Sequence, residues 1–219
     1  MSDPTLHRTH RMLHAWTAPR PASTFSPNHM PTQAYALFPT PIGHCGVAWS
    51  ERGLTGVQLP EQDEAATRAR MRRRFPQCSE AIAPPQVQEA IDAVVALLSG
   101  APTAPVDLSN VVLDMDGVPP FHQRVYELAR RLLPGETVTY GEMDRRLGDH
   151  GAARAVGQAL GSNPFAPVVP CHRVLAADGR AGGFSANGGV TTKLRLLLIE
   201  RARFNGRGLF DDAVDARLS

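Results

Sequence analysis

The chain has 219 residues, of which 42% are hydrophobic, so it is long enough to bury one large core or two small ones. Its formal net charge of +2 gives no polyanion-binding signature, so any nucleic-acid contact must come from a local patch. The three cysteines, Cys45, Cys78 and Cys171, are far apart and lack Cys-x-x-Cys spacing, which argues against a disulfide framework or a zinc site and favours a reducing compartment.

The N-terminal segment, residues 1–33, is predicted to be a disordered leader. It is rich in Pro, Ser, Thr, His and Arg and has no sustained apolar period. It also lacks the apolar core of a signal peptide, and no stretch of the chain reaches membrane-spanning length. We therefore expect a cytoplasmic protein without a membrane partner.

The next segment, 34–116, has the pattern of a small α/β domain. Short β-type runs separated by turn residues predict an antiparallel meander over 34–38, 46–50 and 53–59. Two helices are predicted over 62–75, where acidic residues come early and arginines late, and over 86–98, where apolar residues recur at helical spacing. A linker, 100–105, and a last strand, 106–112, complete this expected domain.

The segment 117–205 is predicted to be a second, mostly helical domain, followed by a tail over 206–219. Apolar residues at helical intervals predict a helix over 121–133. Two short helices follow over 140–147 and 152–160, with Thr139 and Asp149 as their expected caps and Gly148 ending the first. Such a pair, joined by a glycine-containing turn, has the outline of a helix-turn-helix.

The second helix of this pair has an unusual composition for one that reads DNA. Arg154 is its only charged side chain, and the residues around it are small: Gly151, Ala152, Ala153, Ala155, Gly157 and Ala159. Such a face can approach another helix closely, or enter the narrow minor groove, where one arginine can insert into the base stack. Long polar side chains for major-groove base edges are absent, so any DNA contact should depend little on base sequence.

Chemistry is expected at Cys171. Val168 and Val169 are predicted to end a buried strand, and Pro170 then fixes the backbone that presents the thiol. A lone cysteine is usually a small buried apolar residue. Here His172 and Arg173 follow it directly, and neighbouring basic or cationic groups favour the reactive thiolate.

Several motifs together resemble a known family. Pro170-Cys171-His172-Arg173-Val174, preceded by 153–157 (Ala-Arg-Ala-Val-Gly) and by Asn163-Pro164, closely resembles the O6-alkylguanine-DNA alkyltransferases, also called methylated-DNA–protein-cysteine methyltransferases. The match runs from about Phe121 to Ala202. The resemblance implies an α+β protein, with a ribonuclease-H-like α/β N-terminal domain and a mostly helical C-terminal domain containing a helix-turn-helix.

The resemblance implies a catalytic role for five residues. Cys171 matches the alkyl acceptor, and His172 the base that deprotonates it through a water. Glu200, after a helix over 191–199, matches the carboxylate that orients the histidine. Asn163 matches the amide that ties the turn before the cysteine to the helix-turn-helix. Tyr140 matches the tyrosine that rotates the target phosphate and donates a proton to the leaving guanine.

It also implies the residues that contact DNA and the flipped base. Arg154 matches the arginine that fills the gap left by the everted nucleotide. Together with Tyr140, the other expected DNA contacts are Thr139, Ala153, Ala155 and Gly157. The expected walls of the guanine pocket are Pro170, Val174, Phe184 and Ser185, with Phe184 standing where many members have tyrosine. Cys45 and Cys78 do not reproduce the zinc ligands of some members, so we expect no metal and no cofactor.

The chemistry of these residues agrees with such a reaction. Removing an alkyl group from oxygen requires a soft nucleophile and protonation of the leaving base. The base must also be turned out of the duplex. The thioether product is not reversed by hydrolysis, so each protein molecule is expected to act once. The protein is also expected to be a monomer that binds double-stranded DNA through the minor groove, largely independent of base sequence.

Three alternative functions are considered beside alkyl transfer. A non-catalytic lesion sensor would lack the cysteine, which is present. A cysteine hydrolase would bring its histidine from a distant part of the chain. A transcription regulator would require a sequence-specific operator. The sequence leaves open the breadth of alkyl groups, activity on O4-alkylthymine, cooperative DNA binding, regulation and the purpose of the leader.

Overall fold

The first three strands form the predicted antiparallel meander. In the computed structural model, which describes residues 33–100, 106–149 and 151–210, β1 (Gln33–Thr40), β2 (Gly43–Ser50) and β3 (Gly53–Gln58) are joined by two-residue turns. A short β4 (Ser79–Glu80) pairs in parallel with β1, giving the order β3-β2-β1-β4. The predicted leader, linker and tail fall largely outside the described ranges and stay predictions.

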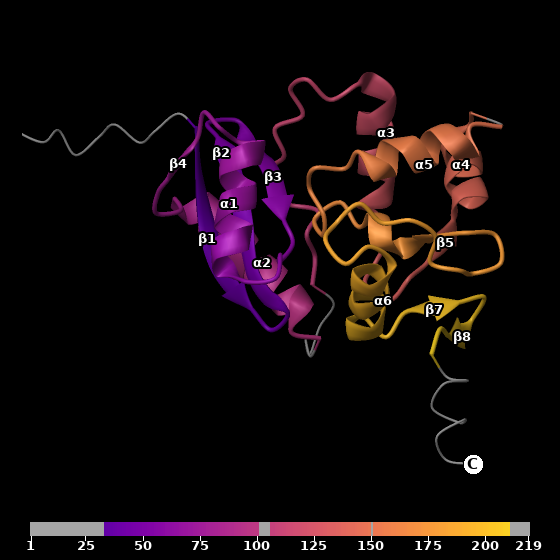
Figure 1. Ribbon diagram of the computed structural model, residues 1–219. Helices are drawn as coiled ribbons and strands as arrows, with labels where there is room; N and C mark the ends of the chain where they lie inside the picture. Colours follow the sequence, from indigo (N-terminus) through magenta and orange to yellow (C-terminus); the bar gives the residue numbers. More distant parts are fainter. Residues whose placement is uncertain (1–32, 101–105, 150, 211–219) are drawn as a thin grey trace, which may run out of the picture. The chain divides into compact units, whose positions relative to one another are not determined.

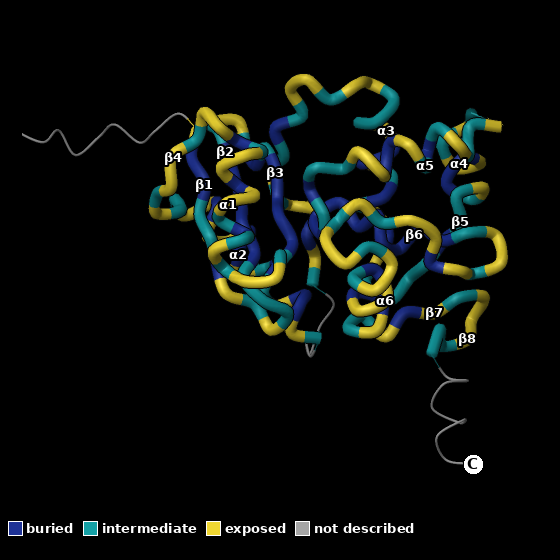
Figure 2. Tube along the Cα trace, in the orientation of Figure 1, coloured by how far each residue is buried: buried dark blue, intermediate teal, exposed yellow. Residues whose placement is uncertain are grey.

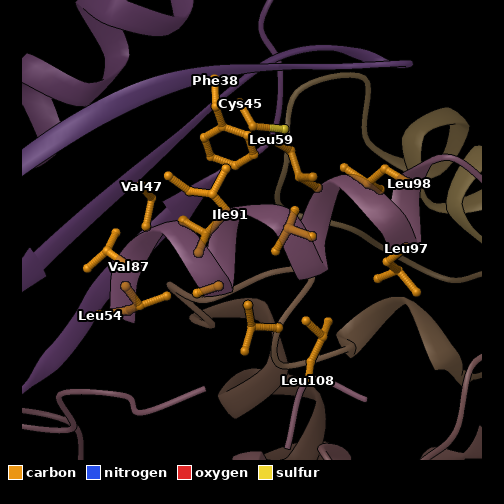
Figure 3. Packing of buried hydrophobic residues seen from close by; sticks show 14 of the residues in the cluster. Phe38, Cys45, Val47, Leu54, Leu59, Val87, Ile91, Leu97, Leu98 and Leu108 are labelled. Atoms are coloured by element: carbon orange, nitrogen blue, oxygen red, sulfur yellow. The ribbon is translucent and has the colours of Figure 1, made fainter. Parts of the chain in front are cut away.

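Helices cover both faces of this sheet because successive side chains of a strand point to opposite sides. Tyr35 and Ala48 pack with Met71 of α1 (Glu64–Arg74), while Phe38 and Val47 belong to the cluster that includes α2 (Pro85–Leu98). Figure 3 shows the side chains of this larger cluster gathered around α2. A Cβ on Gly46 would lie 2.7 Å from Met71, so this glycine allows α1 to approach the sheet.

The predicted last strand over 106–112 is wrong. Only an isolated bridge between Leu54 and Leu113 forms at this edge of the sheet. Arg130 explains the difference, because its guanidinium donates to the carbonyls of Leu108, Ser109 and Val111. Carbonyls bound to an arginine are not free to form a regular ladder of strand hydrogen bonds.

The second half is built from short helices, as predicted. α3 (Pro120–Ala129), α4 (Tyr140–Leu147) and α5 (Ala153–Gly161) pack against one another, and α6 (Val190–Ile199) follows a long loop (Figure 1). α3 ends four residues before its predicted end. The core of this second half includes Val125, Met143, Val156 and Phe165, so the apolar stripes of α3, α4 and α5 face a shared centre. Two small sheets complete the second half. β5 (Val138–Thr139) pairs with β6 (Val174–Leu175), and β7 (Arg203–Phe204) pairs with β8 (Arg207–Gly208).

The caps of α4 and α5 differ from prediction in one respect. Thr139 caps α4 by accepting from Glu142 N, and Gly148 ends that helix at a φ of 77°, both as predicted. Asp149 is not the side-chain cap of α5. Asp144 accepts instead from the backbone N–H groups of Gly151 and Ala152, at 2.8 and 3.1 Å. A carboxylate from within α4 therefore fixes the turn between the two helices.

The described residues all belong to one compact unit, Pro31–Ser219, and the predicted boundary near Gly117 stays a prediction. No helix in the described part of the chain is long and apolar enough to cross a membrane.

Candidate active site

A tight turn presents Cys171. Pro170 has φ −81° and ψ 64°, the values of an inverse γ-turn, and Cys171 N donates to Val169 O at 2.8 Å across it. Cys171 then begins a 3₁₀ turn, Cys171–Arg173, that leads into β6. The strand predicted to end at Val168 and Val169 is wrong, because both residues lie in turns and the strand follows the cysteine.

Asn163 links this turn to the end of α5. Its Nδ2 donates to Val169 O at 2.8 Å and to Cys171 Sγ at 3.2 Å, and its Oδ1 accepts from Phe165 N. One amide thus holds both the carbonyl and the sulfur in place. It also stabilises a negative charge on sulfur, because a donor favours the ionised acceptor.

His172 and Glu200 form a buried pair, with His172 Nε2 2.9 Å from Glu200 Oε1. Arg173 completes a triad around the carboxylate, donating through Nε at 2.9 Å and Nη2 at 2.8 Å. Gly135 N also donates to Glu200, so the carboxylate is fixed from three sides. The second ring nitrogen, Nδ1 of His172, is buried and has no partner among the described residues.

The ionisation of these groups follows from burial and pairing. Burial raises the pKa of the Cys171 thiol, although the hydrogen bond from Asn163 and the charge of Lys193 act against it. Burial lowers the pKa of His172 despite the attraction of Glu200, so the ring is held neutral and able to accept a proton. For Glu200, burial alone would raise the pKa, but His172 and Arg173 outweigh it and lower the value.

A cavity of about 370 Å³ opens at the cysteine. This lies within the range of about 300–1,000 Å³ that is usual for small-molecule sites. The lining residues are Tyr140, Gly157, Leu160, Gly161, Cys171, Gly183, Phe184 and Ser185. Figure 2 shows that much of the loop between β6 and α6, which supplies three of them, is exposed. Among the described residues, no group of three or more His, Cys, Asp or Glu is placed to hold a metal.

The structure brings together most of the residues singled out from the sequence. Tyr140, Gly157, Phe184 and Ser185 share the cavity with Cys171, whereas Pro170 and Val174 do not line it. Burial of the Tyr140 phenol, and then the nearby Cys171, raise the pKa of Tyr140, so the phenol stays protonated at neutral pH.

The α4–α5 residues expected to contact DNA lie at the surface or close to it. Arg154 is exposed near the start of α5. Thr139, Ala153, Ala155 and Gly157 are half-buried. A Cβ on Gly157 would lie 3.8 Å from the Tyr140 ring, so α5 passes close beside this tyrosine.

Two residues of the site were not predicted. Arg173 was noted only as a neighbour of the cysteine, yet it is the main partner of Glu200 besides His172. Lys193 is fully buried, and its Nζ donates to Val174 O at 2.7 Å and lies 6.0 Å from the centroid of the Tyr140 ring. The signal for Lys193 was its rarity, since it is the only lysine of the chain.

Comparisons with known proteins show which family this chain is similar to. The family model described as "6-O-methylguanine DNA methyltransferase, DNA binding domain" matches residues 120–202. A methylated-DNA–protein-cysteine methyltransferase of Methanothermobacter thermautotrophicus is 32% identical over 76% of this chain and 85% of its own length, and one of Mycobacterium tuberculosis is 36% identical over 77% and 93%. The crystal structure of Mycobacterium tuberculosis OGT in complex with DNA aligns with a TM-score of 0.59 and 34% identity, covering 81% of this chain and 99% of that one.

Proposed function

This chain belongs to the methylated-DNA–protein-cysteine methyltransferase family, and we propose that Cys171 is its alkyl acceptor. The protein is a DNA-repair enzyme that acts by alkyl transfer. The observation that carries the assignment to Cys171 is its sulfur at the wall of the cavity, held by Asn163 and adjacent to the buried His172–Glu200 pair. Cys45 is buried in the β-sheet core and Cys78 lies outside the cavity, so neither competes for this role.

In the proposed reaction, Cys171, His172 and Tyr140 each give or accept a proton or an electron pair. The thiol proton passes through a water to the neutral His172, whose cation Glu200 stabilises. The thiolate attacks the alkyl carbon of O6-alkylguanine, an S–C bond forms, and the C–O6 bond breaks with its electron pair going to the base. Tyr140 protonates the leaving base, and its phenolate recovers a proton from the imidazolium or from solvent. The thioether ends the cycle, so each molecule acts once.

Access to the base requires that it leave the duplex. We assign α4 and α5 as a helix-turn-helix that binds the minor groove largely independent of sequence, with Arg154 filling the vacated stack. The small residues of α5 support this, since they let the helix approach the groove closely. The ribonuclease-H-like character of the first half, the domain boundary near residue 117 and the monomeric state belong to the same proposal. The acceptor thiol must stay reduced, which favours the cytoplasm.

The direct test is mass spectrometry of the protein after incubation with duplex DNA containing O6-methylguanine. One methyl group is expected, and peptide mapping should place it on Cys171, with Cys45 and Cys78 as internal controls. Burial raises the pKa of Cys45 to about 12, so it should stay unmodified. Cys171→Ala should bind the duplex but gain no mass. An unmodified wild-type protein that still binds the lesion would instead indicate a sensor.

The role of Arg154 has its own test. Arg154→Ala should slow repair of duplex substrate while leaving single-stranded substrate much less affected, because only the duplex must be unstacked, at a cost of a few kcal/mol. Single-turnover rates on both substrates measure this. Equal losses on the two would remove the base-eversion role.

A further inference from the structure

A second cavity, of about 230 Å³, lies beside the cavity at Cys171. The two cavities share Gly161, Phe184 and Ser185 in their walls. Asn163 also lines the second cavity, and its Nδ2 donates to Cys171 Sγ at 3.2 Å. One side chain thus contacts both the reacting sulfur and the second cavity.

Two arginines of α1 line the second cavity. Arg70 and Arg74 are four residues apart, so they lie on the same face of this helix. The half-buried guanidinium of Arg74 donates only to neutral oxygens, those of Val57, Gln58 and Pro164. The exposed side chain of Arg70 makes no hydrogen bond or ion pair within the described ranges of the chain. Two cations therefore face one cavity, and no anion is paired with either.

The charges around this cavity do not cancel. Among the described residues, its charged lining side chains are Arg70, Arg74 and Glu61. Glu61 accepts from Gln58 Nε2 at 3.2 Å and forms no ion pair with either arginine. Burial, and then the positive charge of Arg70, lower the pKa of Arg74, so the two cations are close enough to repel each other. An anionic group that entered the cavity would relieve this repulsion.

The size of the cavity indicates what fits in it. Its volume of about 230 Å³ is below the range of about 300–1,000 Å³ that is usual for a whole small molecule. It suits the end of a larger ligand whose remainder occupies the neighbouring cavity. The proposed substrate has this form, since a long O6 substituent begins at the carbon that Cys171 attacks. Guanidinium groups bind carboxylates through charge-assisted hydrogen bonds.

We propose that Arg70 and Arg74 form an anion subsite that receives the carboxylate end of a long O6 substituent and makes O6-carboxyalkylguanines preferred substrates. The inference rests on the proposed function and deepens it by naming a substrate class. In the transfer, Cys171 Sγ forms a bond to the carbon attached to O6, the C–O6 bond breaks with its electron pair going to the guanine, and Tyr140 supplies the proton. The carboxylate exchanges no bond and moves with the alkyl group onto the sulfur.

The test uses two duplexes whose lesions differ in one charge. O6-carboxypropylguanine and O6-carbamoylpropylguanine have chains of the same length, and only the first ends in an anion at neutral pH. In wild type, the single-turnover rate should be about fivefold higher for the carboxyl substrate. Arg70→Met should bring the ratio of the two rates to about one, and Arg70→Glu should reverse it, because like charges then meet.

Arg72→Met is the matched control, because Arg72 lies on the same helix and does not line the cavity. It should keep the wild-type ratio. Arg70 is exposed, so its replacement should leave the fold intact. Equal rates for the two substrates in wild type would overturn the proposal. So would a loss of the same factor on both substrates in Arg70→Met, which would assign Arg70 to the DNA backbone.

Failure of the subsite and failure of the proposed function give different results. If wild type accepted no methyl group from O6-methylguanine, the proposed function would fail. If it accepted the methyl group but showed no preference between the carboxyl and carbamoyl substrates, the subsite alone would be rejected.

A second measurement needs no DNA. Iodoacetate and iodoacetamide both alkylate a thiolate with loss of iodide, and only iodoacetate carries a negative charge. The ratio of their rates at Cys171, followed by peptide mapping, should fall in Arg70→Met and stay at the wild-type value in Arg72→Met. A ratio that Arg70→Met left unchanged would contradict an anion subsite beside the sulfur.

Discussion

Asn163 is the side chain that holds the nucleophile most directly. It bonds both Val169 O and Cys171 Sγ, so Asn163→Ala should free the turn and raise the pKa of the thiol. Hydrogen bonds to charged groups contribute about 1.5–3 kcal/mol, which predicts a transfer rate lower by about tenfold or more. Single-turnover kinetics measure the transfer rate, and the pH dependence of Cys171 alkylation by iodoacetamide measures the pKa of the thiol. Asn110→Ala, at an exposed turn, is the control.

Glu200 makes stability depend on pH. Its pKa is depressed in the folded protein because His172 and Arg173 outweigh the effect of burial. A depressed carboxyl pKa stabilises the fold above the unfolded value of about 4.3, and this contribution is lost as pH falls toward the folded value. Glu200→Gln leaves Arg173 buried beside a neutral partner, so at pH 7 it should lower the free energy of unfolding by about 3–5 kcal/mol.

Urea unfolding at several pH values tests this expectation. The difference between wild type and Glu200→Gln should narrow below about pH 4. Asp178→Asn, which breaks the exposed pair with Arg180, should change little at any pH. A difference that stayed constant on acidification would mean that ionisation of Glu200 does not stabilise the fold.

For single residues, the sequence predicted which side chains belong to the site better than it predicted the contacts that they make. The resemblance identified Cys171, His172, Asn163 and Glu200, and the structure brings them together. It did not identify Lys193, because burial and the direction of a side chain on α6 depend on how that helix packs. Pattern alone cannot distinguish a buried lysine from one in solvent.

Asp144 decides the geometry of the helix pair. Its two oxygens accept from the backbone N–H groups of Gly151 and Ala152, in the turn that leads into α5. Asp144→Ala should therefore cost about 1–2 kcal/mol of stability and weaken DNA binding. Asp149→Ala is the matched control, because the sequence predicted Asp149 as the cap and the structure shows it paired with Arg124 instead. Thermal unfolding and duplex affinity should separate the two variants, and a larger effect at Asp149 would contradict the structure.

Elements were predictable where local signals were strong. The meander, the Thr139 cap and the Gly148 end follow from turn and capping residues, and all are observed. The strands predicted over 106–112 and at Val168–Val169 do not form, because Arg130 and Asn163 bind carbonyls of those segments. Arg130 is distant in sequence from the carbonyls it binds, and Asn163 lies six residues before Val169, so the apolar pattern of each predicted strand does not include its competing partner.

The first half of the chain contacts Pro164, which lies beside Asn163 in the second half. Val57 N at the end of β3 donates to Pro164 O at 2.8 Å, next to Asn163. Arg74 at the end of α1 donates to Val57 O, to Gln58 Oε1 and to Pro164 O at 2.9, 2.8 and 3.3 Å. The β-sheet is thus joined by hydrogen bonds to the residue that follows Asn163, whose side-chain amide holds the turn at Cys171.

This junction predicts that a residue outside the cavity affects alkyl transfer. Arg74→Met removes three hydrogen bonds and leaves Pro164 O with the donor Val57 N alone, which should cost about 1–3 kcal/mol of stability. Because Pro164 is directly joined to Asn163, the looser turn should also slow methyl transfer several-fold while duplex affinity holds. Arg73→Met, the exposed neighbour, should leave stability and rate at wild-type values. If Arg74→Met lost stability but kept the wild-type transfer rate, the sheet would support the fold without positioning Cys171.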